Sequence, residues 1–415
     1  MSEQTPAIAA DCLTEELAAL ALISEAEPPV VTRVVFSEAD FRARSYIKKL
    51  AYEAGLTIRE DAVGNTFLRW PGSEPDLPAV ATGSHIDAIP NAGAYDGTVG
   101  VLGGLEAIRA LQRSGFQPRR SIELILFTSE EPTRFGIGCL GSRLMSGVLT
   151  SEQALALRDK DGQSLDELRQ STGFSGEIAS VVIRPGHYHA FVELHIEQGP
   201  ILEQESVDIG IVTHIAAPAS LRAYIQGEGG HAGAMLMPTR HDALCAASEL
   251  ILALESAAKS TGAIDTVATA GICNVFPGAI NSVPSRVHLE IDVRDIDADR
   301  RDSVFSLLKE KAEEVSARRG VQTCFELINA DPPAACAPEI IDAIEAAAQN
   351  AGLSCRRMVS RAYHDSLFVA RFAPVAMIFI PCRGGVSHRP DEYSSPEQIA
   401  SGVRVLAGTL ARLSA

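Results

Sequence analysis

Residues 77–111 read LPAVATGSHIDAIPNAGAYDGTVGVLGGLEAIRAL, and this stretch decides the fold. It opens with a short apolar run, Leu77–Thr82, that predicts a buried strand. A polar loop containing His85 and Asp96 follows, and apolar residues then recur every three or four positions, as on one face of a helix. A strand, a polar loop and a helix in this order indicate an α/β protein with a parallel sheet.

Three more apolar runs look like buried strands: Ile122–Thr128, Phe191–Leu194 and Ala376–Ile380. Helical patterns lie between them. Because strands and helices alternate in this way, we expect a mostly parallel sheet that is covered by helices.

A second pattern occupies the middle of the chain. Strand-like alternation covers Ser220–Gln226, Thr266–Cys273 and Val287–Val293, and helical patterns cover Asp242–Ala258 and 299–318. The order β-α-β-β-α-β is that of a ferredoxin-like α+β sandwich. We therefore predict that residues 215–328 form an inserted domain within a first domain made of residues 1–214 and 329–415.

Composition narrows the range of partners. The chain has 415 residues, of which 46% are hydrophobic and 21% charged, and its formal charge is −17. Such a charge argues against a nucleic-acid partner, because binding to phosphates needs a positive field. No secretory leader or long apolar run is evident, and the eight cysteines form no C-x-x-C pair, so we expect a cytoplasmic protein with reduced thiols and no membrane span.

Metal-capable side chains follow each of the four apolar runs. The carboxyl ends of parallel strands meet at one edge of a sheet, where ligands of α/β proteins gather. We therefore expect one cluster to contain His85, Asp96, Glu131, His195 and His388. Imidazoles and carboxylates suit a pair of divalent cations, and one carboxylate can bridge the two.

Two further carboxylates have predicted roles at this cluster. Asp87 could accept the second ring proton of His85 and so fix its tautomer. Glu130 could act as general base while its neighbour Glu131 binds a metal. Taken singly, each of these residues is more often a helix cap or a solvated group, so the prediction depends on their joint placement.

Other patterns give weaker signals. Gly97–Gly104 lacks the G-x-G-x-x-G spacing of a dinucleotide loop, and close packing of a helix on the sheet is the better interpretation. His187 and His189 follow Pro185-Gly186 and indicate a solvated turn. Neither G-x-S-x-G nor H-E-x-x-H occurs, which argues against common serine hydrolases and single-zinc proteases.

The inserted domain contains three candidate substrate residues. His231 lies between glycines, which would let another molecule approach closely, and Asn281 follows a Pro-Gly turn. Arg294 ends a predicted strand and could clamp a carboxylate, although such arginines usually make surface ion pairs.

Seven motifs together resemble one group of enzymes, the dinuclear-metal amidohydrolases. This group includes N-carbamoyl-L-amino-acid hydrolases, allantoate amidohydrolases and ureidoglycolate amidohydrolases, which are relatives of aminoacylases. The resemblance covers nearly the whole chain and is carried by GSHIDAIPNAGAYDGTVGVLGG, TSEEPTRFGIGCLGS, ELHIEQGPILE, GGHAGAMLMPTRHDAL, FPGAINSVPSRVHLEIDVRDID, SRAYHDSLF and CRGGVSHRPDEYSS.

The resemblance implies a role for each matching residue. His85 and His195 would hold one metal, Glu131 and His388 the other, and Asp96 would bridge both. Glu130 matches the general base. The matching substrate positions are His231, Asn281, Arg294, Gln198 and His364. The resemblance also implies that the inserted domain is a lid that forms a homodimer and reaches the site of the partner subunit.

The segments Ser360–Ser366 and Ile378–Cys382 look most like the ureidoglycolate branch. There Tyr363 would hydrogen-bond the glycolate hydroxyl, and manganese is favoured over zinc. The implied activity is metal-dependent hydrolysis of a ureido C–N bond in a small substrate that carries a carboxylate. Three alternatives stay open at this point: a sister ureido substrate, an aminoacylase or dipeptidase activity, and a metal-stabilised binding protein without turnover.

Overall fold

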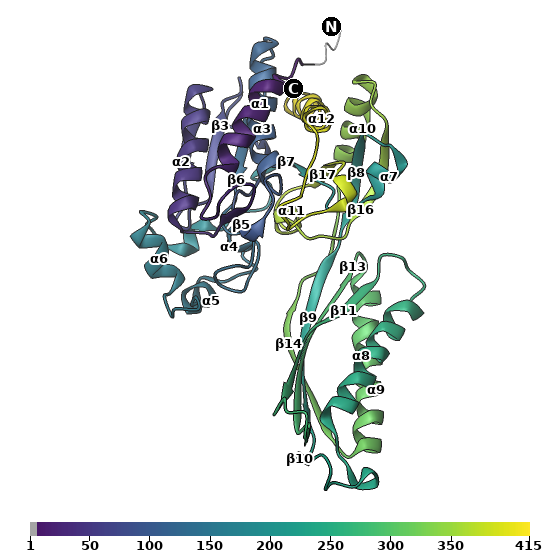
Figure 1. The fold of residues 1–415 in the computed structure, drawn as a ribbon. Helices are drawn as coiled ribbons and strands as arrows, with labels where there is room; N and C mark the ends of the chain where they lie inside the picture. Colours follow the sequence, from purple (N-terminus) through teal and green to yellow (C-terminus); the bar gives the residue numbers. More distant parts are fainter. Residues whose placement is uncertain (1–5) are drawn as a thin grey trace. The chain divides into compact units, whose positions relative to one another are not determined.

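The computed structural model describes residues 6–415. It divides into two compact units (Figure 1). Unit 1 contains the chain up to Thr213 together with Cys336–Ser360 and His364–Ala415. Unit 2 contains His214–Ala335 and also the short segment Arg361–Tyr363.

Unit 1 is built on a sheet whose centre is parallel. Its four central strands, in spatial order, are β17 (Val375–Ile380), β7 (Tyr188–Ile196), β4 (Ala79–Ser84) and β6 (Ile122–Leu126). These are the four strands that the apolar runs predicted, and the prediction of a mainly parallel core is confirmed. Every residue of β4, β6 and β17 is buried, which explains why these strands are mostly apolar and do not alternate between apolar and polar residues.

Antiparallel strands extend this sheet on both sides. One side adds β3 (Thr66–Trp70) and β2 (Thr57–Glu60), and the other adds β8 (Ile209–Ile215) with β16 (Cys355–Ser360) beside it. A separate ribbon pairs β1 (Val31–Arg33) with β5 (Ala88–Ala92). The helices of unit 1 are α1 (Ala10–Ala21), α2 (Glu38–Glu53), α3 (Thr98–Arg113), α4 (Leu140–Met145), α5 (Ser151–Ala156), α6 (Leu165–Ser171), α7 (Ile201–Glu205), α10 (Pro338–Asn350), α11 (Asp365–Val369) and α12 (Pro396–Ser414). Of the helices described between residues 6 and 415, none has both the length and the apolar character needed to cross a bilayer.

Helix α3 lies unusually close to the sheet, as the glycines before and within it suggested. A Cβ atom added at Gly100 would come within 2.5 Å of the carbonyl oxygen of Leu194 and 2.6 Å of the Cβ of Ser84. One added at Gly104 would meet the side chain of Leu124 at 2.8 Å. The glycines therefore serve close packing of a helix on strands, and the interpretation preferred from the sequence is confirmed.

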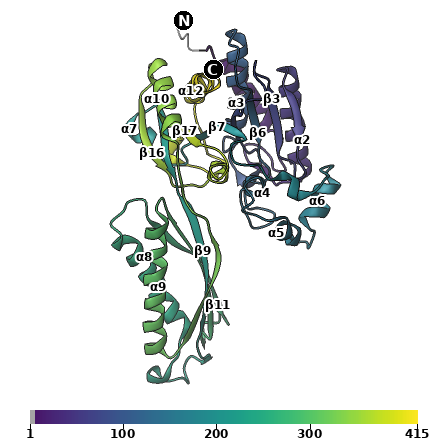
Figure 2. The same cartoon turned by 180° about the vertical axis from the view of Figure 1, so that it is seen from behind.

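Unit 2 is a four-stranded antiparallel sheet with two long helices on one face (Figure 2). Its elements in chain order are β9 (Ala217–Gln226), α8 (Ala243–Ser260), β11 (Val267–Phe276), β13 (Arg286–Asp295), α9 (Ala298–Arg319) and β14 (Gln322–Ala330). The strand order β11-β13-β9-β14 is that of a ferredoxin-like sandwich. The alternation seen in the sequence is explained by burial, because Val287, Leu289, Ile291 and Val293 all face the helices and are buried.

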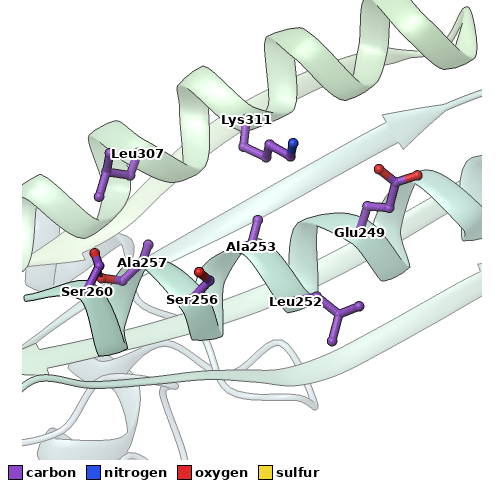
Figure 3. Close-up of a pocket in the computed structure, with 8 residues that line it drawn as sticks. All are labelled: Glu249, Leu252, Ala253, Ser256, Ala257, Ser260, Leu307 and Lys311. Carbon is purple, nitrogen blue, oxygen red and sulfur yellow. Dashed lines mark hydrogen bonds between the residues drawn. The ribbon is translucent and has the colours of Figure 1, made fainter.

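An open cavity of about 530 Å³ lies between α8 and α9 (Figure 3). Leu252, Ser256 and Leu307 line it together with Lys311, and its one carboxylate, Glu249, pairs with Arg319 at 2.6 Å. The lining has no imidazole and no second carboxylate. This cavity therefore lacks the side chains of the predicted metal site, which we expect at the edge of the sheet of unit 1.

Candidate metal centre

The ends of the four central strands and the loops that follow them bring the five predicted ligands into one cluster in unit 1, with His195 still inside β7. Asp96 takes part in both of the relevant groups of metal-capable side chains. The first group is His85, Asp96 and His195, and the second is Asp96, Glu131 and His388. Within each group the ligand atoms lie within 4.8 Å of one another.

The two oxygens of Asp96 face different partners. Oδ1 lies 3.1 Å from Nε2 of His195 and 3.5 Å from Nε2 of His85. Oδ2 lies 3.2 Å from Nε2 of His388, and this same nitrogen lies 3.3 Å from Oε1 of Glu131. Asp96 is thus placed between two sets of ligands, as a bridging carboxylate must be.

The second ring nitrogens of two histidines fix how these rings are protonated. Nδ1 of His85 lies 3.0 Å from the carbonyl oxygen of Asp87, and Nδ1 of His195 lies 2.9 Å from that of Ile196. Since a carbonyl can only accept, each Nδ1 carries a proton. In the neutral rings both Nε2 lone pairs therefore point at the carboxylate of Asp96, which is repulsive unless a proton or a metal cation lies between them.

Asp87 contributes differently from the sequence-based expectation. The backbone carbonyl of Asp87, not its carboxylate, is the closer acceptor for His85, because Oδ1 lies 3.6 Å from Nδ1. The carboxylate instead accepts the backbone N–H groups of Glu130 and Glu131 at 3.1 and 3.0 Å. Asp87 therefore joins the loop after β4 to the loop after β6.

Glu130 lies beside the cluster without being part of either group. Its Oε2 is 3.8 Å from Nε2 of His85, and the thiol of Cys139 donates to Oε1 at 3.4 Å. Burial raises the pKa of Glu130 well above its usual value, an effect that His85 opposes and Glu131 increases. A buried carboxylate with a raised pKa is a suitable proton acceptor and donor.

The carboxylates and imidazoles of the cluster shift one another's pKa values. Burial raises the pKa of Asp96, but hydrogen bonds from His195, His388 and His85 outweigh burial and hold it well below the usual value. Hydrogen bonds to Asp96 and then to Glu131 raise the pKa of His388 to about 11. The carboxylates of the cluster thus favour positive charge beside them, which a metal cation would also supply.

Two further buried carboxyl groups, Glu193 and Asp365, lie near the cluster, and the sequence did not predict them. Glu193 on β7 accepts hydrogen bonds from Ser84 at 2.8 Å and Ser366 at 2.5 Å. Burial, followed by Glu193, raises the pKa of Asp365 to about 8, and Ser142 donates to it at 2.5 Å. Glu193 offered one signal in the sequence, since a charged residue interrupts an otherwise apolar run.

Glu392 was also missed. It is 4% exposed, and burial together with Asp96 raises its pKa to about 6. Its surroundings in the sequence, HRPDEYSS, are typical of a solvated loop, so the sequence offered no signal for its burial.

Of the predicted substrate residues, two lie in unit 1 near the ligands. Nε2 of Gln198 donates to Oδ2 of Asp96 at 2.8 Å and lies 3.2 Å from Oγ of Ser387. Oε1 of Gln198 is buried without a hydrogen-bond partner among the described residues. The ring of His364 packs 4.5 Å from that of His195, and its Nε2 lies 3.1 Å from Oγ of Ser360.

The other four substrate candidates belong to unit 2. His231 on β10 (Gly230–His231) is exposed, and the N–H of Ala232 donates to the carbonyl of Asn281 at 2.9 Å, so His231 and Asn281 are neighbours. Arg294, near the end of β13, pairs with Asp292 at 2.8 Å. Tyr363 lies in the short segment Arg361–Tyr363.

The donor set fits divalent cations. Two ligand atoms that each lie about 2.1 Å from one metal are separated by about 3.0–3.4 Å in octahedral or tetrahedral geometry. The separations from Asp96 to His195 and His388, 3.1 and 3.2 Å, are in this range, and that to His85 is slightly longer at 3.5 Å. The two groups of imidazoles and carboxylates could therefore each hold a metal ion.

Comparison with known proteins places this site in a family. Residues 81–412 match the peptidase family M20/M25/M40. The ureidoglycolate hydrolase of Arabidopsis thaliana is 55% identical over 409 residues, which are 97% of this chain and 86% of the relative. The N-carbamoyl-L-amino acid amidohydrolase of Geobacillus stearothermophilus is 38% identical over 384 residues, 92% of this chain and 93% of the relative.

Solved structures agree with these sequence relatives. Crystal structures of AtUAH in complex with glyoxylate and with (S)-hydroxyglycine are 54% and 53% identical to this chain. Both have a TM-score of 0.88 and cover 99% of this chain and 99% of their own. Because the family match spans most of the chain and the relatives match almost its full length, the chain belongs to the peptidase family M20/M25/M40.

Proposed function

We propose that this chain is a metal-dependent amidohydrolase that cleaves the ureido C–N bond of (S)-ureidoglycolate and yields glyoxylate, ammonia and carbon dioxide. The observation that carries the proposal is the position of Asp96 between His85 and His195 on one side and His388 on the other. The similarity to ureidoglycolate hydrolase supports the choice of substrate.

Two divalent cations would occupy the site. One would be held by His85, His195 and Oδ1 of Asp96, and the other by His388, Glu131 and Oδ2 of Asp96. The ligand set contains no thiolate, which is compatible with Mn²⁺ or Zn²⁺, and we favour Mn²⁺. When bound, such a pair of cations acidifies a water molecule and polarises the carbonyl group of the substrate.

Glu130 is the general base in this proposal. It is buried beside His85, and Cys139 donates to Oε1, which leaves Oε2, 3.8 Å from Nε2 of His85, to accept a proton from the attacking water. The carboxylate takes the proton from this water and then delivers it to the departing nitrogen. The raised pKa of Glu130 favours the second transfer, because it makes the carboxylate able to hold the proton until the C–N bond breaks.

The ligands of the two AtUAH structures are consistent with one reaction sequence. Hydrolysis of the ureido group of (S)-ureidoglycolate releases carbamate, which decomposes to carbon dioxide and ammonia, and leaves hydroxyglycine. Hydroxyglycine then loses ammonia to give glyoxylate. Since (S)-hydroxyglycine and glyoxylate are the molecules bound in the relative, we propose that this chain passes through the same two products.

Further residues would bind the substrate in this proposal. Arg294 would clamp the carboxylate, and Gln198 would offer its unpaired Oε1 to an N–H of the ureido group. His364 and Tyr363 complete the proposed pocket, with the phenol of Tyr363 bonded to the glycolate hydroxyl. Asn281 would hold the carboxylate together with Arg294, and His231 would stabilise the oxyanion that develops during the reaction.

Within unit 2, Arg294 and His231 lie too far apart to contact one small substrate together. Arg294 of β13 lies opposite Pro218 of β9, at one end of the sheet. Arg286 of β13 lies opposite Gln226 of β9 at the other end, and β10 with His231 lies beyond that end (Figure 1). Eight residues of extended strand separate Arg286 from Arg294, or about 27 Å at 3.4 Å per residue. A substrate as small as ureidoglycolate cannot span this length. We therefore propose a homodimer in which residues 215–328 act as the lid and dimerisation domain, and in which the partner subunit supplies His231 and Asn281.

The choice of substrate is tested by comparing three compounds. Metal-free protein is reconstituted with Mn²⁺ and incubated with (S)-ureidoglycolate, allantoate or an N-carbamoyl amino acid, and ammonia and glyoxylate are measured. We expect a kcat/KM for (S)-ureidoglycolate at least about tenfold above the others, a difference of about 1.4 kcal/mol in the transition state. A preference for either of the other two compounds would assign the chain to a sister activity.

The role of Glu130 is tested by Glu130→Gln, which keeps the shape of the side chain but removes its basicity. We expect kcat to fall by about 10²–10⁴-fold, because general base catalysis contributes this much, while the metal content stays unchanged. Metal content is measured by elemental analysis alongside activity. Glu152→Gln, an exposed residue in α5, is the matched control. A Glu130→Gln variant with wild-type kcat contradicts the assignment.

The shared site is tested by mixing two inactive variants, His231→Ala and Arg294→Met. In a mixed dimer, the site of the His231→Ala subunit has its own Arg294 and receives an intact His231 from the partner subunit. The site of the Arg294→Met subunit has neither residue. After dissociation and random reassociation, half of the dimers are mixed, so we expect about a quarter of wild-type activity to return. If the mixture stays inactive although mixed dimers form, each subunit uses its own residues and the proposed arrangement is wrong.

A further inference from the structure

Glu392 lies between two loops that carry proposed metal ligands and come from distant parts of the chain. Its Oε1 accepts the backbone N–H groups of Tyr95 and Asp96 at 2.8 and 3.0 Å. Its Oε2 accepts the hydroxyl of Ser387 at 2.9 Å, directly before His388. A single carboxylate therefore joins the loop of Asp96 to the loop of His388.

The surroundings of Glu392 are built to admit it. A Cβ atom added at Gly93 would lie 2.4 Å from the Cβ of Glu392, so only glycine leaves room for this side chain. His388 has a φ of 58°, a left-handed conformation that is uncommon for residues other than glycine. Local preference does not favour this conformation, and the hydrogen bond from the neighbouring Ser387 to Glu392 is one of the contacts that hold the loop in it.

The hydroxyl of Ser387 gives this arrangement a direct effect on Asp96. Oγ of Ser387 lies 2.9 Å from Oε2 of Glu392 and 3.0 Å from Oδ2 of Asp96, but a hydroxyl has one proton to donate. Nε2 of Gln198 already donates to Oδ2 of Asp96 at 2.8 Å. When Ser387 donates to Glu392, Oδ2 of Asp96 keeps a lone pair for a cation.

We infer that Glu392 is a positioning residue that sets the affinity of the cation site formed by Oδ2 of Asp96, Glu131 and His388. The inference rests on the proposed function, because it concerns the second of the two proposed cations. Outer hydrogen-bond partners of metal ligands orient those ligands, and their loss typically weakens metal binding by about 10–100-fold. Glu392 acts in this way on a carboxylate and on an imidazole at once.

Two substitutions at Glu392 distinguish an effect of its hydrogen bonds from an effect of its side-chain volume. Glu392→Ala removes all three hydrogen bonds, and we expect Mn²⁺ affinity at the second site to fall by about 10–100-fold while the first site keeps its affinity. In Glu392→Gln the amide oxygen can still accept both N–H groups, and the NH₂ group can donate to Ser387, which then donates to Asp96. The two backbone contacts are kept, but the new hydrogen bond from Ser387 occupies the lone pair of Oδ2 of Asp96, so we expect a Mn²⁺ affinity between those of the wild type and Glu392→Ala.

The measurement is calorimetric titration of metal-free full-length protein with Mn²⁺, combined with kcat at saturating Mn²⁺. Excess Mn²⁺ should restore part of the kcat of Glu392→Ala, which a general loss of structure would not allow. Asp391→Asn is the matched control, because Asp391 is the preceding residue, is exposed, and its side chain pairs with Arg389 at 2.7 Å. If Glu392→Ala does not fold, Ser387→Ala decides: it removes the contact next to His388 but keeps the backbone contacts of Tyr95 and Asp96, so a smaller loss at the second site is expected.

The outcomes distinguish this inference from the proposed function. If the wild-type protein binds two Mn²⁺ ions and Glu392→Ala, or Ser387→Ala in its place, binds both with unchanged affinity, the inference is overturned and the proposed function stands. If Glu392→Gln loses as much affinity as Glu392→Ala, hydrogen-bond positioning is likewise overturned. If the wild-type protein binds no pair of Mn²⁺ ions, the proposed function itself fails.

Discussion

The structure of the site depends on one carboxylate, that of Asp96. Its two oxygens face opposite sets of ligands, with His195 at 3.1 Å from Oδ1 and His388 at 3.2 Å from Oδ2. Such a convergence of imidazoles and carboxylates is unfavourable without positive charge, because buried anions repel one another and lose their hydration. The arrangement is consistent with a site built around cations, and the catalytic roles proposed for the neighbouring residues follow from that.

The fold holds Asp96 in place through contacts that are themselves buried. The parallel strands deliver their loops to one edge of the sheet, and glycines such as Gly100 let α3 approach that edge closely. Arg33, which is fully buried, donates to the carbonyl of Ile86 at 2.7 Å and so fixes the loop between His85 and Asp87. Asp87 in turn holds the backbone of Glu130 and Glu131. The ligands are therefore positioned by backbone hydrogen bonds more than by their own side-chain contacts.

The sequence predicted the elements with strong periodicity and the ligands that follow them. The four parallel strands could be predicted because burial on both faces leaves a short apolar run. The helix after Asp96 could be predicted because one buried stripe gives apolar residues every three or four positions. The strands of the β-α-β-β-α-β order could be predicted because burial of one face makes apolar and polar residues alternate. The convergence of the five ligand candidates followed from the rule that parallel strands end at one edge. What could not be predicted depends on tertiary burial: Glu392 and Asp365 occur among polar residues, and nothing local indicates that they are inside. The atom through which Asp87 contacts His85 was also out of reach, since the choice between carbonyl and carboxylate depends on the turn after β4.

We propose that one cation lies on each side of Asp96. Anomalous diffraction at the manganese edge, from a crystal grown with Mn²⁺, tests this most directly. We expect two peaks in the anomalous difference map, about 3.5 Å apart. One should lie beside His85 and His195 and the other beside His388 and Glu131, with Asp96 between them. A map with no peak at Asp96, and with the imidazoles of His85 and His388 directed into separate regions, would contradict the proposal.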